Sequence, residues 1–182
     1  MKKKIIISGF GGQGVLLLGK LIAESALTQE LHTTWMPSYG PEMRGGTCNC
    51  TVQYGDEEIS APVVDKPDIL IALNEPSLDK FGPRVVEGGV IITNSNIVFK
   101  KCDNLNKGVK VFELPMDEIA VNINKRGGNI VGLGALVKLV GDIKEASAIK
   151  AIEETFSAPD KQKFIPSNIE CLKQGIERAG KL

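Results

Sequence analysis

The stretch SGFGGQGV, residues 8–15, decides how the rest of the sequence is interpreted. Its three glycines spell the pattern G-x-G-x-x-G. Residues 3–7, KKIII, precede it, and such a β-branched run predicts a strand buried on both faces. Apolar residues then recur at helical spacing over residues 15–29. The order strand, glycine turn and helix is typical of α/β proteins that place an anion at the start of the helix.

Strand and helix patterns follow one another along the rest of the chain. Further strands are predicted for residues 32–36, 48–54, 68–73, 89–93 and 109–114, with 57–61 returning as the hairpin partner of 48–54. Helices are predicted from Asn74 with Pro76 in the first turn, over 116–123, over 130–140, from Asp142 as N-cap through Phe156, and over 167–179. Because no linker or repeat interrupts them, residues 1–182 are expected to form a single domain. The predicted fold is a three-layer, Rossmann-like α/β fold with a mostly parallel, mixed sheet.

The glycine pattern by itself leaves the ligand open. A dinucleotide site also needs an acidic residue at the end of the second strand, where it holds the adenosine ribose. Residues 33–38, TTWMPS, contain neither a carboxylate nor an arginine for a 2′-phosphate. A stand-alone NAD(P)- or FAD-binding protein therefore remains only an alternative. A glycine turn that merely lets helix and sheet pack is another.

A second glycine-rich loop, PSYGPEMRGGT at residues 37–47, follows the second predicted strand. Ligands of open α/β sheets bind in crevices at the carboxyl ends of the strands. We therefore expect this loop, with Arg44, to share one edge of the sheet with the turn at residues 11–14. Backbone N–H groups beside a guanidinium suit a phosphate or carboxylate. They would equally suit a glycine-lined protein interface.

Composition excludes several other classes of function. Lys and Arg number 22, as do Asp and Glu, so no nucleic-acid or membrane-surface partner is expected. No segment approaches the roughly 18 apolar residues of a transmembrane helix, and Lys2–Lys4 does not begin a signal peptide. A cytoplasmic location is the resulting expectation.

Residues that could bind a metal ion or form a catalytic triad are scarce in this sequence. Four cysteines, at positions 48, 50, 102 and 171, lack the paired C-x-x-C spacing of zinc or iron–sulfur sites. They are expected to be thiols of a reducing compartment. His32 is the only histidine, which argues against a histidine-centred triad or a multi-histidine metal site.

Four segments in this order resemble the gamma subunit of 2-oxoacid:ferredoxin oxidoreductases. They are GFGGQGV (9–15), PSYGPEMRGG (37–46), GGNIVGLGALVKLVG (127–141) and IPSNIECLKQGIERA (165–179). The SYGPE-RGG form is most similar to the 2-oxoglutarate and ketoisovalerate members. Indolepyruvate relatives share the final Arg-Gly-Gly and lack the Tyr-Gly-Pro-Glu run.

The resemblance implies a complex that converts a 2-oxoacid and coenzyme A into acyl-CoA, CO2 and reduced ferredoxin. Thiamine diphosphate with Mg, and iron–sulfur clusters, belong to its alpha, beta and ferredoxin-like delta subunits. The gamma chain alone holds none of these cofactors, is inactive by itself, and serves assembly and coenzyme A positioning. A non-catalytic assembly protein of another complex is the second alternative. Exposed glycine loops would also let the isolated chain form a homodimer.

Ten residues in the two glycine loops are the predicted contacts, with positioning as their role and no catalytic residue among them. They are Gly11, Gly12, Gln13, Gly14, Tyr39, Gly40, Glu42, Arg44, Gly45 and Gly46. Asn129 stands at the head of an apolar segment, where the sequence leaves two roles open: capping a helix or reaching an interface.

Overall fold

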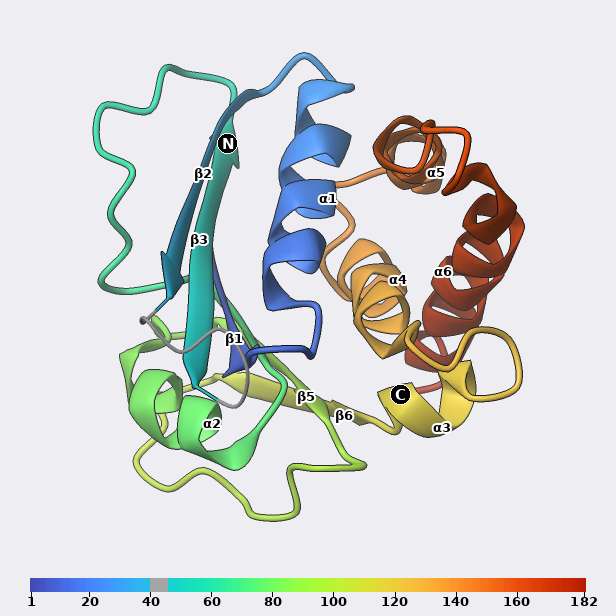
Figure 1. The fold of residues 1–182 in the computed structure, drawn as a ribbon. Coiled ribbons are helices and arrows are strands. Elements are labelled where there is room, and N and C mark those ends of the chain that lie inside the picture. The colour runs from blue at the N-terminus through green and yellow to red at the C-terminus, as the bar shows by residue number, and fades with distance from the viewer. Residues whose placement is uncertain (40–45) are drawn as a thin grey trace.

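The computed structural model describes residues 1–39 and 46–182. Their centre is a six-stranded sheet in the order β2-β3-β1-β4-β5-β6 (Figure 1). The strands are β1 (Lys2–Phe10), β2 (His32–Tyr39), β3 (Thr47–Gly55), β4 (Ile69–Ala72), β5 (Val90–Asn94) and β6 (Lys110–Leu114). Neighbours β1, β4, β5 and β6 are parallel, whereas β3 runs antiparallel to both β1 and β2. The prediction of a mostly parallel, mixed sheet is confirmed.

Helices cover both faces of this sheet. They are α1 (Val15–Leu27), α2 (Glu75–Phe81), α3 (Met116–Ala120), α4 (Gly128–Val140), α5 (Glu145–Thr155) and α6 (Ile165–Ala179). Figure 1 shows α1, α4, α5 and α6 gathered on one side, with α2 on the other. No helix in the described part of the chain is long and apolar enough to span a bilayer.

The buried strand β1 contributes side chains to two separate apolar cores. Ile5 and Ile7 point into the larger core, which contains α1, α4, α5 and α6. Ile6 points the opposite way, into a smaller core with Leu78 and Phe81 of α2. This alternation is the physical reason for the continuous apolar run, because both faces of the strand are covered.

The first turn of α2 follows the prediction. Asn74 is its N-cap, and the side-chain Oδ1 accepts a hydrogen bond of 2.9 Å from the Ser77 amide. Pro76 lies in the first turn, where its missing N–H costs nothing.

Three local predictions were wrong. Residues 57–61 form no strand, because β2 and β1 already occupy both edges of β3. Asp142 does not cap α5, whose N-cap is Lys144 with no side-chain cap bond. Instead Asp142 lies 4.0 Å from the Lys3 Nζ atom, at the opposite end of the sheet from the glycine turn. Pro166 lies within the first turn of α6, which therefore begins earlier than expected.

Candidate functional site

The candidate site lies where chain connections leave the sheet in opposite directions. β1 continues into α1 on one face of the sheet, and its parallel neighbour β4 continues into α2 on the other. Such a switch point opens a crevice at the carboxyl ends of the two strands.

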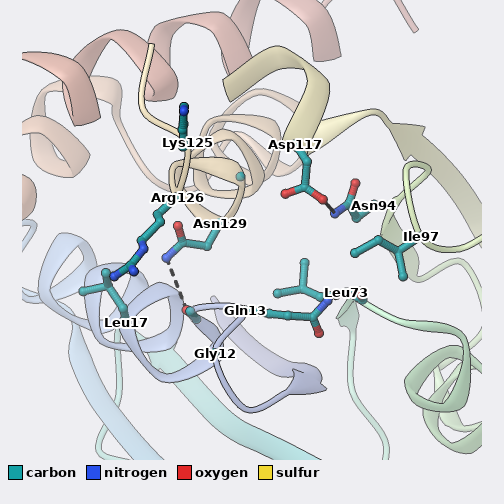
Figure 2. A pocket seen from close by; sticks show the side chains of 12 residues that line it. Gly12, Gln13, Leu17, Leu73, Asn94, Ile97, Asp117, Lys125, Arg126 and Asn129 are labelled. Carbon is teal, nitrogen blue, oxygen red and sulfur yellow. Dashed lines mark hydrogen bonds between the residues drawn. The ribbon is translucent and has the colours of Figure 1, made fainter. Parts of the chain in front are cut away.

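A pocket of about 690 Å³ occupies this position (Figure 2). Its walls come from the loop after β1, the ends of β4 and β5, α3, and the start of α4. The lining residues are Gly12, Gln13, Gly14, Leu17, Leu73, Asn94, Ile97, Asp117, Lys125, Arg126, Gly128 and Asn129.

The glycine turn at residues 11–14 has a backbone that only glycine adopts readily. Gly12 and Gly14 have φ angles of 101° and 76°, in the left-handed region. Gly14 is also the N-cap of α1, and no side chain caps this helix. The partial positive charge of the α1 N-terminus therefore lies at the pocket wall.

Gln13 fastens this turn to the neighbouring strand. Its Oε1 accepts a hydrogen bond of 2.6 Å from the Phe10 amide, and its Nε2 donates one of 2.9 Å to the Leu73 carbonyl. Both ends of the side-chain amide are thus engaged by backbone. Gln13 lines the pocket and holds the turn in place.

In the part of the chain that the structure describes, the two glycine loops meet at one edge of the sheet, as the sequence predicted. The Gly11 amide donates a hydrogen bond of 3.0 Å to the Gly46 carbonyl. Tyr39 ends β2 at this same edge, where its backbone pairs with Cys48. Gly40, Glu42, Arg44 and Gly45 lie outside the described residues, so their proximity to the pocket stays a prediction.

The far wall of the pocket was not foreseen from the sequence. Asn94 ends β5, and its Nδ2 donates to Asp117 Oδ2 at 2.8 Å, while its Oδ1 accepts from the Met116 amide at 3.1 Å. A polar residue directly after a buried strand, as in NSN at 94–96, was the only local signal for this wall.

Asn129 links the two sides of the pocket and does not cap α4. The N-cap is Gly127, so Asn129 already lies in the first helical turn. The residue is 5% exposed, and its Nδ2 donates a hydrogen bond of 3.3 Å to the Gly14 carbonyl (Figure 2). The predicted capping role was wrong because a glycine pair starts the helix one residue earlier.

The histidine and the cysteines do not join the site. His32 begins β2 at the opposite edge of the sheet, where it pairs with Gly55. Within residues 1–39 and 46–182, no three His, Cys, Asp or Glu side chains gather as a metal site. Burial raises the pKa of Cys50 to about 12 and that of Cys171 to about 11, which disfavours the reactive thiolates.

The sheet order also weighs against a dinucleotide site. β3 lies between β1 and β2, so the end of β2 is two strands away from the glycine turn. That spacing is about 9.6 Å, and β2 ends in TWMPSY without a carboxylate. The ribose contact that completes the dinucleotide pattern has no counterpart on this strand.

Fold and pocket together define a Rossmann-like α/β protein whose glycine turn faces a crevice without the dinucleotide acid. The family model for pyruvate ferredoxin/flavodoxin oxidoreductase matches residues 4–178. The chain belongs to this family, which confirms the resemblance found in the sequence.

Relatives of two lengths match the chain. Ketoisovalerate oxidoreductase subunit VorA of Methanothermobacter thermautotrophicus is 40% identical over 97% of this chain, which spans only 36% of that protein. The 2-oxoglutarate synthase subunit KorC of Methanocaldococcus jannaschii is 35% identical over 100% of this chain and 96% of its own length. The chain thus spans about a third of VorA and nearly all of KorC.

A solved structure supports the fold over the full length. The gamma subunit of a keto/oxoacid ferredoxin oxidoreductase from Geobacter sulfurreducens superimposes with a TM-score of 0.81 and 30% identity. The match covers 99% of both chains.

Proposed function

We propose that this chain is the gamma-type subunit of a multi-subunit 2-oxoacid:ferredoxin oxidoreductase. The observation that carries the proposal is the end-to-end correspondence with KorC and with the Geobacter gamma subunit. The candidate site is consistent with this proposal. The described pocket is lined by backbone amides, side-chain amides and charged groups, and its lining residues include no nucleophile with an adjacent base.

In this proposal the complex oxidatively decarboxylates a 2-oxoacid in the presence of coenzyme A and reduces ferredoxin. The partners are alpha, beta and delta subunits, and the setting is the cytoplasm. The first candidate for the substrate is 2-oxoglutarate, since KorC is a relative of matching length and is 35% identical to this chain. In this proposal, thiamine diphosphate, Mg and iron–sulfur clusters are assigned to the other subunits, as the family resemblance implies.

This chain contributes the positioning of coenzyme A. Phosphate groups are held by the amides at the start of α1, by the Gly11–Gly14 turn and by the loop that contains Arg44. Gln13 keeps the turn in register through its two backbone hydrogen bonds. The proposed residues orient a substrate and transfer no proton.

Substitution Arg44→Ala separates coenzyme A positioning from assembly. We expect the KM for coenzyme A to rise about 10-fold or more, because a charge-assisted hydrogen bond to phosphate is lost. CO2 release in the absence of coenzyme A stays near the wild-type rate. Equal losses in both measurements would instead assign Arg44 to subunit contact.

Reconstitution tests the proposed function as a whole. The isolated chain is expected to be colourless and inactive. Added to alpha, beta and delta subunits that lack it, the chain restores viologen reduction that requires both a 2-oxoacid and coenzyme A. Equal activity and equal coenzyme A affinity without the chain would refute the proposal.

A further inference from the structure

Three polar side chains meet at the end of the sheet that lies away from the candidate site. Lys3 of β1 and Tyr54 of β3 are direct register partners, so their side chains lie on the same face of the sheet. Asp142 belongs to the connection between α4 and α5, and its Oδ2 atom lies 4.0 Å from the Lys3 Nζ atom. The three residues therefore join two strands to the helical layer.

Two of these side chains have an unpaired polar atom. Tyr54 is 0% exposed, and neither its hydroxyl nor the buried Oδ2 atom of Asp142 has a hydrogen-bond partner among the described residues. Native structures rarely leave such atoms unpaired in the interior, because the loss of hydration is not compensated. A phenol donates a hydrogen bond and an ionised carboxylate only accepts one. Each group thus offers what the other lacks.

The carboxylate of Asp142 acts on the Tyr54 hydroxyl. Burial raises the pKa of Tyr54 above its ordinary value, and the negative charge of Asp142 and then that of Asp68 raise it further. The hydroxyl therefore keeps its proton well into the alkaline range and remains a donor. Lys3 supplies a positive charge close to the Asp142 carboxylate.

The backbone of the same connection is held by Gln29, which follows α1. Gln29 Nε2 donates a hydrogen bond of 2.9 Å to the Asp142 carbonyl, and its Oε1 accepts one of 2.6 Å from the Lys144 amide. Asp142 is thus fixed through its main chain, while its carboxylate lies toward Lys3 of the sheet.

We propose that Tyr54, Asp142 and Lys3 form a polar anchor that holds the end of α4 against the sheet. The Tyr54 hydroxyl donates to Asp142 Oδ2, directly or through one water, and Lys3 balances the charge of the carboxylate. α4 has 13 residues, which makes it about 20 Å long, and its first turn lines the pocket. The anchor therefore fixes this helix at the end that lies away from the candidate site. It depends on the fold alone, so its failure would leave the proposed function untouched.

A double-mutant cycle of the full chain tests the interaction between Tyr54 and Asp142. Tyr54→Phe and Asp142→Ala are each expected to raise the equilibrium constant for urea unfolding about 10-fold, because a buried group loses its partner. The double variant is expected to raise it about 10- to 30-fold, well below the roughly 100-fold product of two independent losses. Asp65→Ala is the matched control, because the Asp65 side chain is 80% exposed. Its effect multiplies with that of Tyr54→Phe.

Amide hydrogen exchange shows where the anchor acts. Tyr54→Phe is expected to speed exchange of the Gly141 and Lys144 amides about 10-fold, because these amides lie at the end of α4 and in the connection. The Val121 amide, which donates to the Asp117 carbonyl beside the pocket, is the control and changes less than about 2-fold. A general loss of stability would speed all three equally.

Three results would overturn the inference. They are a Tyr54→Phe variant at least as stable as the wild type, multiplicative effects of Tyr54→Phe and Asp142→Ala, and equal acceleration of the three amides. Tyr54→Phe removes one oxygen and keeps the ring, so this variant alone tests the anchor if the double variant fails to fold.

Discussion

At the scale of single residues, the glycine turn of the site depends on the Gln13 side chain, which forms two hydrogen bonds to backbone. Its amide joins the backbone of Phe10, the last residue of β1, to that of Leu73, which directly follows the parallel strand β4. The sequence places Gln13 correctly in the turn. Its hydrogen-bond partners depend on strand order, however, and no local pattern encodes a contact between residues 60 positions apart.

Substitution Gln13→Leu removes both hydrogen bonds while keeping much of the volume. We expect the free energy of unfolding to fall by about 1–3 kcal/mol, because two backbone groups lose a partner. Urea unfolding followed by the fluorescence of Trp35, the single tryptophan, measures it. Gln174→Leu is the control, because the hydrogen bond from Gln174 to Glu170 on α6 is exposed to solvent, and it stays within about 0.5 kcal/mol. Equal effects of the two substitutions would contradict a stabilising role for the two Gln13 hydrogen bonds.

Cys50 predicts how stability depends on pH. Burial raises its pKa to about 12, above the ordinary thiol pKa of about 8.5. Above pH 9 the unfolded chain loses this proton and the folded chain keeps it. The free energy of unfolding therefore falls as pH rises, by at most about 1.4 kcal/mol per pH unit for this group.

Unfolding of wild type and Cys50→Ala between pH 8 and about pH 11 isolates this contribution. The wild-type curve should fall more steeply above pH 9, while the two slopes agree below it. Identical slopes across the whole range would contradict the assigned cause.

At the scale of elements, the crossing of α4 and α6 fixes the start of α4 at the pocket. A Cβ on Gly134 would collide with the Leu172 carbonyl oxygen, and one on Gly175 with the Val131 carbonyl oxygen. Both obstacles are backbone atoms, which cannot rotate away. The absence of a side chain at Gly134 and Gly175 therefore lets the two helices approach closely.

Gly134→Ala and Gly175→Ala should each lower the free energy of unfolding by about 1–3 kcal/mol or more, because the helices must separate. Gly180→Ala is the control, since its Cβ would approach the flexible Lys138 side chain at 3.1 Å. Chemical denaturation measures all three. Wild-type stability for the Gly134 variant would refute the close crossing.

The predicted elements show where local pattern suffices. The buried strands and α1, α2 and α4 were recognised because their periodicity, caps and apolar runs are local. The expected hairpin at residues 57–61 failed because pairing depends on which strand already occupies an edge. Asp142 failed as a cap because its carboxylate lies toward Lys3 of a distant strand.

At the scale of the whole molecule, the candidate site joins segments that are far apart in the sequence. Gly14 and Asn129 are 115 residues apart and connected by one hydrogen bond. The glycine loops were predictable from their composition. The walls formed by Asp117 and Arg126 were not, because loop residues acquire a position only when the sheet and α4 are assembled.

The relatives of this chain differ in length, which bears on the proposal that the chain is a separate subunit. This chain spans 36% of VorA and 96% of KorC, so its fold occurs both within a longer protein and as a separate subunit. In the proposed function this chain is a separate subunit, and its partners carry the remaining chemistry.

Affinity purification of the tagged full chain from its native cells tests this claim most directly. We predict co-purification of alpha, beta and delta polypeptides in equal stoichiometry, with bound thiamine diphosphate and iron–sulfur absorption, and viologen reduction that requires a 2-oxoacid and coenzyme A. Recovery of the chain alone, or with partners that lack these cofactors and this activity, would contradict the account.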